Sequence, residues 1–195
     1  VNIYALDDGP AGWTLVDTGL DWARGRAALQ AALAGPLAGR PVHREIVTHH
    51  HPDHIGLAGW LQAEQGSTIC TSQTAWLFAR MLTLDAQTAP TPEHLAFWRS
   101  AGMAPAEFAR RSGERPFNFA DCVAPMALGF SRLGEGDRVQ AGGRGWVVRL
   151  GQGHAPDQLT LWSEDGALVI GADQLLPGIS PNLGVYPTEP EADPV

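Results

Sequence analysis

The chain has 195 residues, of which 44% are hydrophobic and 17% are charged, a composition typical of one globular domain with a core of ordinary size. Its formal net charge of −8 argues against nonspecific binding to nucleic acid or to anionic membrane surfaces. No apolar run approaches the roughly 18 residues that a membrane-spanning helix needs.

The first part of the chain predicts strands that alternate with helices. Apolar alternation marks the strands, and glycine, proline and aspartate clusters separate the elements. In chain order, the expected elements are a strand at 1–6, a strand at 13–16, a helix at 21–34, a strand at 44–48, a helix at 55–65 and a strand at 67–71.

Residues 73–128 predict helices only, and we interpret them as an insert. Helical composition occurs at 73–87, 91–102 and 104–113, with proline and glycine between the segments. The many aromatic side chains of the insert are more typical of core packing than of a substrate site. We nevertheless hypothesise that the insert forms a lid, because it separates the two parts of the chain whose strand ends carry the candidate ligands named below.

The third part of the chain predicts strands again. Residues 136–154 read as strand, turn and strand, and residues 157–173 read as a hairpin with Asp165 and Gly166 at its turn. We therefore expect one α+β domain over residues 1–195. The two cysteines, Cys70 and Cys122, cannot form a disulfide framework, so we expect buried thiols, a reducing compartment and a cytoplasmic protein.

Residues 46–56, IVTHHHPDHIG, crowd four of the seven histidines of the chain into six positions. Crowding is costly, because protonated rings repel one another and each nitrogen of a neutral ring needs its own partner. In an extended chain, alternate residues point to the same side. His49 and His51 are therefore predicted to face one point, whereas His50 points away and is not expected to be a ligand.

Asp53 and His54 are predicted to turn toward the same point. Pro52 redirects the chain, and both residues then lie at the start of a helix. Asp53 could be an N-cap of a helix that begins at Ile55, and we expect it to cap and ligate at once. Imidazoles together with a carboxylate suit Zn²⁺, and also iron or manganese.

Two further polar residues stand alone after apolar strands. His154 follows WVVRLGQG, and Asp173 follows ALVIGA. Their placement repeats that of the histidine cluster, so we expect them to complete the site. His43 and His94 are expected to lie on the surface.

These motifs resemble those of the metallo-β-lactamase superfamily. THHHPDH matches the T-H-x-H-x-D-H signature, and VDTG with Asp17, GQGHAPDQLTLW with His154 and LVIGAD with Asp173 match the other motifs in the same order. The resemblance covers nearly the whole chain apart from the insert. It is nearest to the glyoxalase II-like, thioesterase or lactonase part of the superfamily.

The resemblance implies a four-layer αββα sandwich, here truncated at the C-terminus, with two metal ions, most simply Zn²⁺, at one edge. By the same resemblance, His49, His51 and His154 hold the first metal. Asp53 and His54 hold the second, Asp173 bridges the two, and Asp17 supports them from behind. The family's remaining histidine ligand has no counterpart after His154, so we expect it beyond residue 195.

The implied function is that of a metal-dependent hydrolase. A metal-activated hydroxide would attack an ester, thioester, lactone or amide carbonyl, or a phosphoester, of a small molecule, with Asp53 orienting the nucleophile and moving a proton. One alternative is a mononuclear iron oxygenase of the persulfide dioxygenase type, and another is a non-catalytic protein that keeps the fold. The sequence leaves the substrate and a homo-oligomer open.

Overall fold

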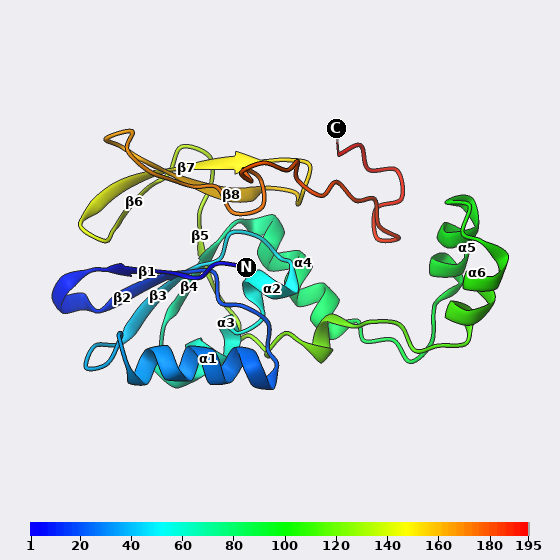
Figure 1. The fold of residues 1–195 in the computed structure, drawn as a ribbon, viewed down its shortest axis with the longest axis horizontal. Coiled ribbons are helices and arrows are strands. Elements are labelled where there is room, and N and C mark those ends of the chain that lie inside the picture. The colour runs from blue at the N-terminus through cyan, green and yellow to red at the C-terminus, as the bar shows by residue number, and fades with distance from the viewer. Residues whose placement is uncertain (195) are drawn as a thin grey trace.

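The computed structural model describes residues 1–194, which form two β-sheets packed face to face. Figure 1 shows the second sheet above the first, with helices α1 (Ala23–Ala34) and α3 (Ala58–Gln65) on the opposite face of the first sheet. Of the four layers expected, the described residues thus form three in succession: helices, sheet and sheet. The expected α+β class is confirmed.

The first sheet is mostly parallel. Its strands, in order across the sheet, are β1 (Tyr4–Asp7), β2 (Trp13–Val16), β3 (Val42–Ile46), β4 (Thr68–Thr71) and β5 (Ser131–Arg132). The first pair is antiparallel, and the remaining pairs are parallel. The carboxyl ends of the parallel strands therefore meet at one edge, where the loops that follow them can gather side chains from different parts of the chain.

The second sheet is an antiparallel meander. It comprises β6 (Arg138–Ala141), β7 (Arg144–Gly151), β8 (Gln158–Ser163) and β9 (Val169–Ile170). Alternate residues of these strands point inward, and Trp146, Val148 and Leu161 are buried against the inner face of the first sheet. This apolar contact holds the two sheets together.

The remaining helices are α2 (Pro52–Ile55), α4 (Gln73–Leu84), α5 (Pro92–Ser100) and α6 (Pro105–Ser112), with short 3₁₀ turns η1 (Gly9–Ala11) and η2 (Phe119–Asp121). The single helix predicted at 55–65 is wrong, because α2 and α3 are separate. At the break, the Leu57 amide donates to the Gly19 carbonyl at 3.0 Å and the Gly56 carbonyl accepts from the Ala124 amide at 2.8 Å, so these backbone groups bond outside the helix. Asp53 is also not the N-cap, because α2 begins at Pro52 and places Asp53 in its first turn.

A second apolar core joins the first sheet to its helices. Leu15, Leu29 and Leu61 pack there with almost no exposed surface. Glu45 is also fully buried, and burial raises the pKa of its carboxyl to about 8 although a hydrogen bond from the Ser67 hydroxyl opposes the shift. The Glu45 carboxyl is therefore mainly neutral at pH 7, which limits the cost of keeping it inside.

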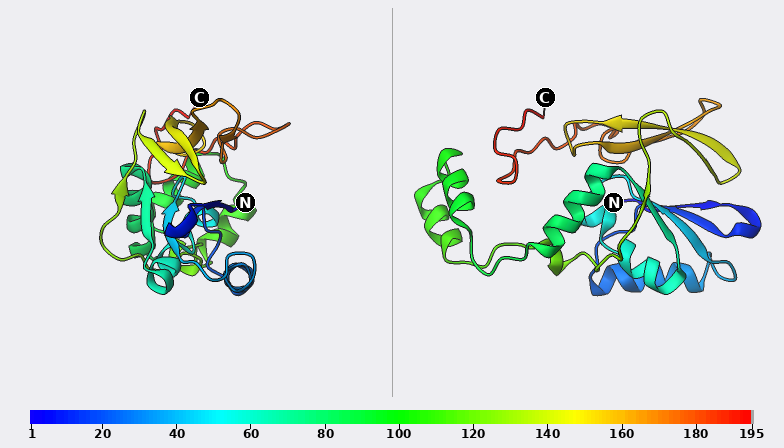
Figure 2. Two further views of the ribbon diagram at one scale, coloured as in Figure 1. Left: turned by 90° about the vertical axis from the view of Figure 1, so that its left-hand side faces the viewer. Right: turned by 180° about the vertical axis from the view of Figure 1, so that it is seen from behind.

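The helices of residues 73–128 divide into a buried root and an exposed arm. Helix α4 buries Ala75, Trp76 and Ala79 in the body of the molecule. Helices α5 and α6 bury no residue, and Figures 1 and 2 show this pair standing away from the sheets at the end of two extended connections. The hypothesis that the insert is a lid, and its boundaries as an insert in one domain, stay predictions.

Both cysteines are free and buried, as expected. Within residues 1–194, no helix has the length and apolar character needed to cross a membrane.

Candidate metal centre

The candidate ligands gather at the edge where the parallel strands end, which we call the ligand edge (His49, His51, His54, His154 and Asp173). β3 ends at Ile46, and the histidine cluster follows within three residues. His154 lies in the turn between β7 and β8, and Asp173 follows β9. Both sheets thus contribute to the ligand edge, so the site forms only when the two sheets pack.

Three imidazole nitrogens converge at this edge. The Nδ1 atom of His51 lies 2.9 Å from Nε2 of His49 and 2.9 Å from Nε2 of His154. The three side chains are close enough for one metal ion to contact all of them. The predicted pointing of His49 and His51 toward one place is what the structure has, and His154 joins them from the second sheet.

Hydrogen bonds on the outer side of the rings determine which nitrogens carry protons. The Thr48 hydroxyl donates to Asp17 Oδ2 at 3.0 Å, and its lone pair faces His49 Nδ1 at 3.0 Å, so this ring nitrogen is the donor. The Asn182 carbonyl oxygen can only accept, and it lies 2.9 Å from His154 Nδ1. The Nε2 atoms of His49 and His154 therefore both present lone pairs to the centre of the site.

His54 forms the same arrangement with Asp17. Its Nδ1 atom donates to Asp17 Oδ2 over 2.8 Å, so Nε2 is the free nitrogen. This buried Nε2 atom has no hydrogen-bond partner among residues 1–194. Carboxylate oxygens of Asp173 and Asp53 lie 3.4 and 3.6 Å from it. A lone pair facing two carboxylates is unfavourable unless a proton or another cation lies between them.

Asp173 joins the two parts of the site. Its Oδ2 atom lies 3.4 Å from Nε2 of His54 and 3.4 Å from Nε2 of His154. His49, His54 and Asp173 form a second group compact enough for one metal ion, and His49 belongs to both groups. Asp53 lies outside both groups, with a side chain that is 45% exposed.

The ionisation of the histidines suits metal binding. Burial, aided by the neighbouring rings, lowers the pKa of His49 far below its ordinary value, and burial together with His154 lowers that of His51 to about 4. Both rings are neutral at pH 7 and keep their lone pairs. For His54, burial also lowers the pKa, but the hydrogen bond and charge of Asp17 outweigh burial and raise it overall.

The donor set therefore fits a divalent metal. The neutral rings of His49 and His51, the orphaned Nε2 atom of His54 and the adjacent carboxylate of Asp173 are the nitrogen and oxygen ligands that Zn²⁺ and Fe²⁺ accept. The geometry brings together His49, His51, His54, His154 and Asp173, and it leaves Asp53 at the margin. Which of these side chains bind a metal stays a prediction.

His50 points away from the converging nitrogens. Its ring packs against Phe78 of α4, with 5.1 Å between ring centres, and stacks at 6.3 Å on Phe119 of η2. Thr48 and Asn182 are partners of the site that sequence reasoning missed. Thr48 adjoins the cluster and could have been considered, but Asn182 stands 28 residues after His154 with no pattern around it.

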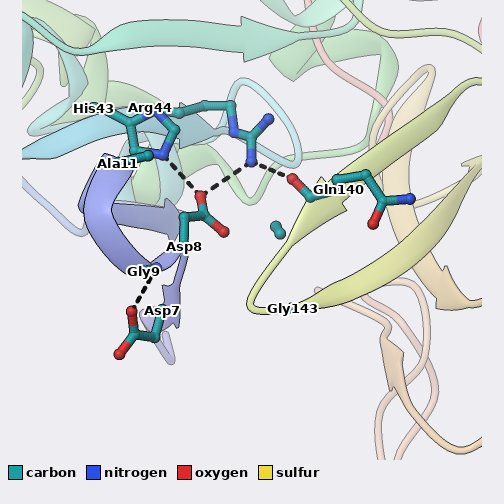
Figure 3. Close-up of a pocket in the computed structure, with 9 residues that line it drawn as sticks. Asp7, Asp8, Gly9, Ala11, His43, Arg44, Gln140 and Gly143 are labelled. Atoms are coloured by element: carbon teal, nitrogen blue, oxygen red, sulfur yellow. Dashed lines mark hydrogen bonds and ion pairs between the residues drawn. The ribbon is translucent and has the colours of Figure 1, made fainter.

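A cavity lies at the opposite edge of the sandwich (Figure 3). It measures about 730 Å³, and its lining includes Asp8, His43, Arg44 and Gln140, which we call the Asp8 edge. Asp8 accepts hydrogen bonds from Thr14, Arg44 and the Gly142 amide, and Arg44 donates to the Gln140 carbonyl. The polar side chains there are paired with one another, so the Asp8 edge joins the sheets and is not a second candidate site.

A smaller cavity of about 510 Å³ adjoins the ligand edge. Its lining includes His154 and Asp173 together with the apolar side chains of Leu176, Ile179 and Leu183. A bound molecule in this cavity would meet candidate ligands on one side and apolar surface on the other.

Comparison with solved structures gives neighbours of the same fold. A β-lactamase domain protein from Burkholderia ambifaria is 34% identical over 97% of this chain and 54% of its own, with a TM-score of 0.76. A metallo-β-lactamase family protein from Thermus thermophilus is 28% identical over 96% of this chain and 58% of its own, with a TM-score of 0.67. The chain thus spans little more than half the length of either protein.

A third solved structure, of a protein in a di-iron-bound form, is 22% identical over 95% of this chain and 71% of its own, with a TM-score of 0.61. At this identity the likeness concerns the fold alone. Comparison with curated protein sequences gives no match.

The expected metallo-β-lactamase fold is confirmed by these neighbours and by the arrangement of the two sheets. Residues 1–193 match the sequence pattern of the metallo-β-lactamase superfamily. The match includes every candidate ligand at the ligand edge. The chain belongs to the metallo-β-lactamase superfamily.

Proposed function

We propose that this protein is a metal-dependent hydrolase that attacks the carbonyl of an ester, thioester, lactone or amide in a small molecule. One observation carries the proposal: outer hydrogen bonds turn the Nε2 lone pairs of His49 and His154 toward the same point, where His51 also lies. A site that only stabilised the fold would pair these nitrogens with donors.

We propose zinc as the metal, with His49, His51 and His154 as one ligand group. His49, His54 and Asp173 form the group that would hold a second ion, with Asp53 at its margin. The chemistry that zinc supplies when bound is a hydroxide nucleophile near pH 7 and polarisation of a carbonyl oxygen.

The protein's own side chains would transfer a proton, orient a ligand and exclude water. Asp53 is positioned to accept a proton at Oδ2, because its side chain is partly exposed to solvent and this atom lies 3.6 Å from the ring of His54. Asp17 orients His54 by accepting its Nδ1 proton. The apolar lining of the adjacent cavity would exclude water from one side of the substrate and orient its acyl part.

The experiment is elemental analysis of the full-length protein, followed by assays on a panel of thioesters, lactones, aryl esters and amides. We expect about two zinc ions per chain and hydrolysis of at least one carbonyl class, lost on treatment with a chelator and restored by zinc. Zinc content without any hydrolysis would favour a non-catalytic protein that keeps the fold.

The alternative function is an iron oxygenase, and the same elemental analysis distinguishes it from the hydrolase. One iron per chain, with oxygen consumed in the presence of a persulfide, would contradict the hydrolase. A di-iron form of one structural neighbour makes iron a necessary part of the measurement. Iron content together with hydrolysis would keep the reaction and replace the metal.

A further inference from the structure

The turn that carries His154 is fastened to helix α4 by Asp157. The Thr74 hydroxyl, in the first turn of α4, donates to Asp157 Oδ2. Gln152 Nε2 donates to Asp157 Oδ1 at 2.7 Å, and the Asp157 amide donates back to Gln152 Oε1 at 3.2 Å. Asp157 thus joins both sides of the turn that presents His154, and it joins that turn to a helix whose inner face is buried.

The same network continues to the neighbour of Asp173. The side-chain amide of Gln174 donates to the Gln152 carbonyl at 2.9 Å. The two segments are tightly packed, because a Cβ atom at Gly151 would lie 2.8 Å from the Gln174 side chain. Thr74, Asp157, Gln152 and Gln174 therefore form a continuous polar chain that flanks both candidate ligands of the second sheet.

The next turn of the same helix contacts the histidine cluster. Phe78 lies one turn after Thr74 on α4, and the centre of its ring lies 5.1 Å from that of His50. His50 is the residue between His49 and His51 in the sequence. Helix α4 thus touches the ligand-bearing segments of both sheets. It connects these two segments, by the hydrogen bond of Thr74 in its first turn and by the packing of Phe78 in its second.

Asp157 adopts a strained backbone conformation that its surroundings hold in place. Its φ angle is +49°, in the left-handed region that costs energy for residues other than glycine. Aspartate and asparagine tolerate this region better than most residues. The backbone conformation alone would favour glycine, and the aspartate adds the side-chain hydrogen bonds with Thr74 and Gln152.

We propose that Asp157 is a positioning residue that sets the distance between His154 and the histidine cluster by bonding the His154 turn to Thr74. This inference rests on the proposed metal site. The Asp157 carboxylate does not contact the candidate metal positions, so its effect passes through the orientation of His154 and Asp173. Removing it should loosen the metal without unfolding the protein.

The test compares Asp157→Gly with Asp157→Asn in the full-length protein. Glycine removes the side chain and also relieves the positive φ angle, so backbone strain does not confuse the result. Asparagine keeps an oxygen acceptor and the tolerated backbone conformation. Asp165→Gly, in the exposed turn between β8 and β9, is the matched control because it removes an aspartate from a turn far from α4.

The readout is zinc affinity of the metal-free protein, measured by competition with a coloured chelator, together with the melting temperature of the metal-free form. We expect Asp157→Gly to weaken zinc binding by about 10–100-fold, the range seen for outer partners of metal ligands. Thr74→Val should weaken it in the same direction, and the double variant should add little to Asp157→Gly. Asp157→Asn and Asp165→Gly should bind zinc like the unchanged protein.

Two results would overturn the inference, and they differ from failure of the proposed function. Unchanged zinc affinity in Asp157→Gly would remove the positioning role while leaving the hydrolase intact. Equal loss in the Asp165→Gly control would show that the effect is general destabilisation. Failure of the unchanged protein to bind zinc would instead overturn the proposed metal site, and this inference with it.

Discussion

The ligand edge and the Asp8 edge are opposite ends of one sandwich, and both crowd polar side chains between the two sheets. At the Asp8 edge, each donor faces an acceptor: Asp8 accepts from Thr14 at 2.6 Å and lies 2.7 Å from His43 Nε2. At the ligand edge, the Nε2 lone pairs of His49 and His154 both lie 2.9 Å from Nδ1 of His51, which carries at most one proton to share between them. Crowding alone therefore does not indicate function, whereas a surplus of acceptors does.

The two edges also differ in which residues adopt positive φ angles. Within residues 1–194, the non-glycine residues with positive φ are Asp17, Asp157 and Ala172, and all three adjoin the ligand edge. At the Asp8 edge, positive φ angles fall on glycines such as Gly9 and Gly142. Glycine adopts this conformation at little cost, so the strain of the molecule is concentrated beside the candidate ligands.

The strongest test of this difference is His51→Ala. It removes the nitrogen that faces both His49 and His154, so we expect the metal to be lost and hydrolysis to fall by more than about 100-fold, since loss of outer partners alone costs roughly 10–100-fold. Metal content and rate are measured on the same preparation. Retention of full metal and full rate would show that these rings do not form the site.

Asp17→Asn tests the support behind the ligands. Asparagine keeps the shape and tolerates the φ angle of +63°, but it removes the charge that holds His54 and Thr48. We expect zinc affinity to fall by about 10–100-fold while the protein stays folded. Chelator competition gives the affinity, and circular dichroism checks the fold; an affinity equal to that of the unchanged protein would contradict the role.

Asp8→Ala should have the opposite pattern of effects. It leaves the Thr14 hydroxyl and the Gly142 amide without their acceptor and removes the carboxylate beside Arg44, so we expect a loss of about 2–4 kcal/mol in the free energy of unfolding. Metal content and zinc affinity should not change. Denaturant unfolding measures the loss, and reduced zinc binding in this variant would mean that the two edges are not independent.

The loss of unfolding free energy in Asp8→Ala should also depend on pH. Burial raises the pKa of Asp8, but hydrogen bonds from Thr14, Gly142 and His43 outweigh burial and hold it below its ordinary value of 3.8. A lowered carboxyl pKa stabilises the fold above that ordinary value and ceases to do so as the pH falls through the lowered pKa. The stability difference between Asp8→Ala and the unchanged protein should therefore be full at about pH 6 and shrink below about pH 4.

His43→Ala should have the smallest effect. The His43 side chain is 33% exposed, and Asp8 keeps its other donors when the ring is removed. We expect a loss of about 0.5–1 kcal/mol, the contribution of one hydrogen bond that water can partly replace. Thermal unfolding at neutral pH measures it, and a loss as large as that of Asp8→Ala would show that His43 is a central member of the Asp8 edge.

The sequence predicted the parts of the ligand edge that are local. His49 and His51 are two residues apart on an extended segment, so their common direction follows from backbone geometry. The strand ends before His154 and Asp173 were also predictable from apolar patterning. The break between α2 and α3 was not, because there the Leu57 amide donates to the carbonyl of Gly19, which lies far away in the sequence.

The sequence by itself determined the α+β class, the order of the elements and the residue types that could bind a metal. Only the tertiary structure decided which ring nitrogens face inward, because the tautomer of His154 depends on the Asn182 carbonyl and that of His49 on Thr48, whose hydroxyl is directed by Asp17, 31 residues away. It also brought the Thr74 hydroxyl to Asp157, 83 residues away. Local sequence patterns determine the backbone conformation of each segment. Hydrogen bonds between distant segments exist only after the two sheets have packed.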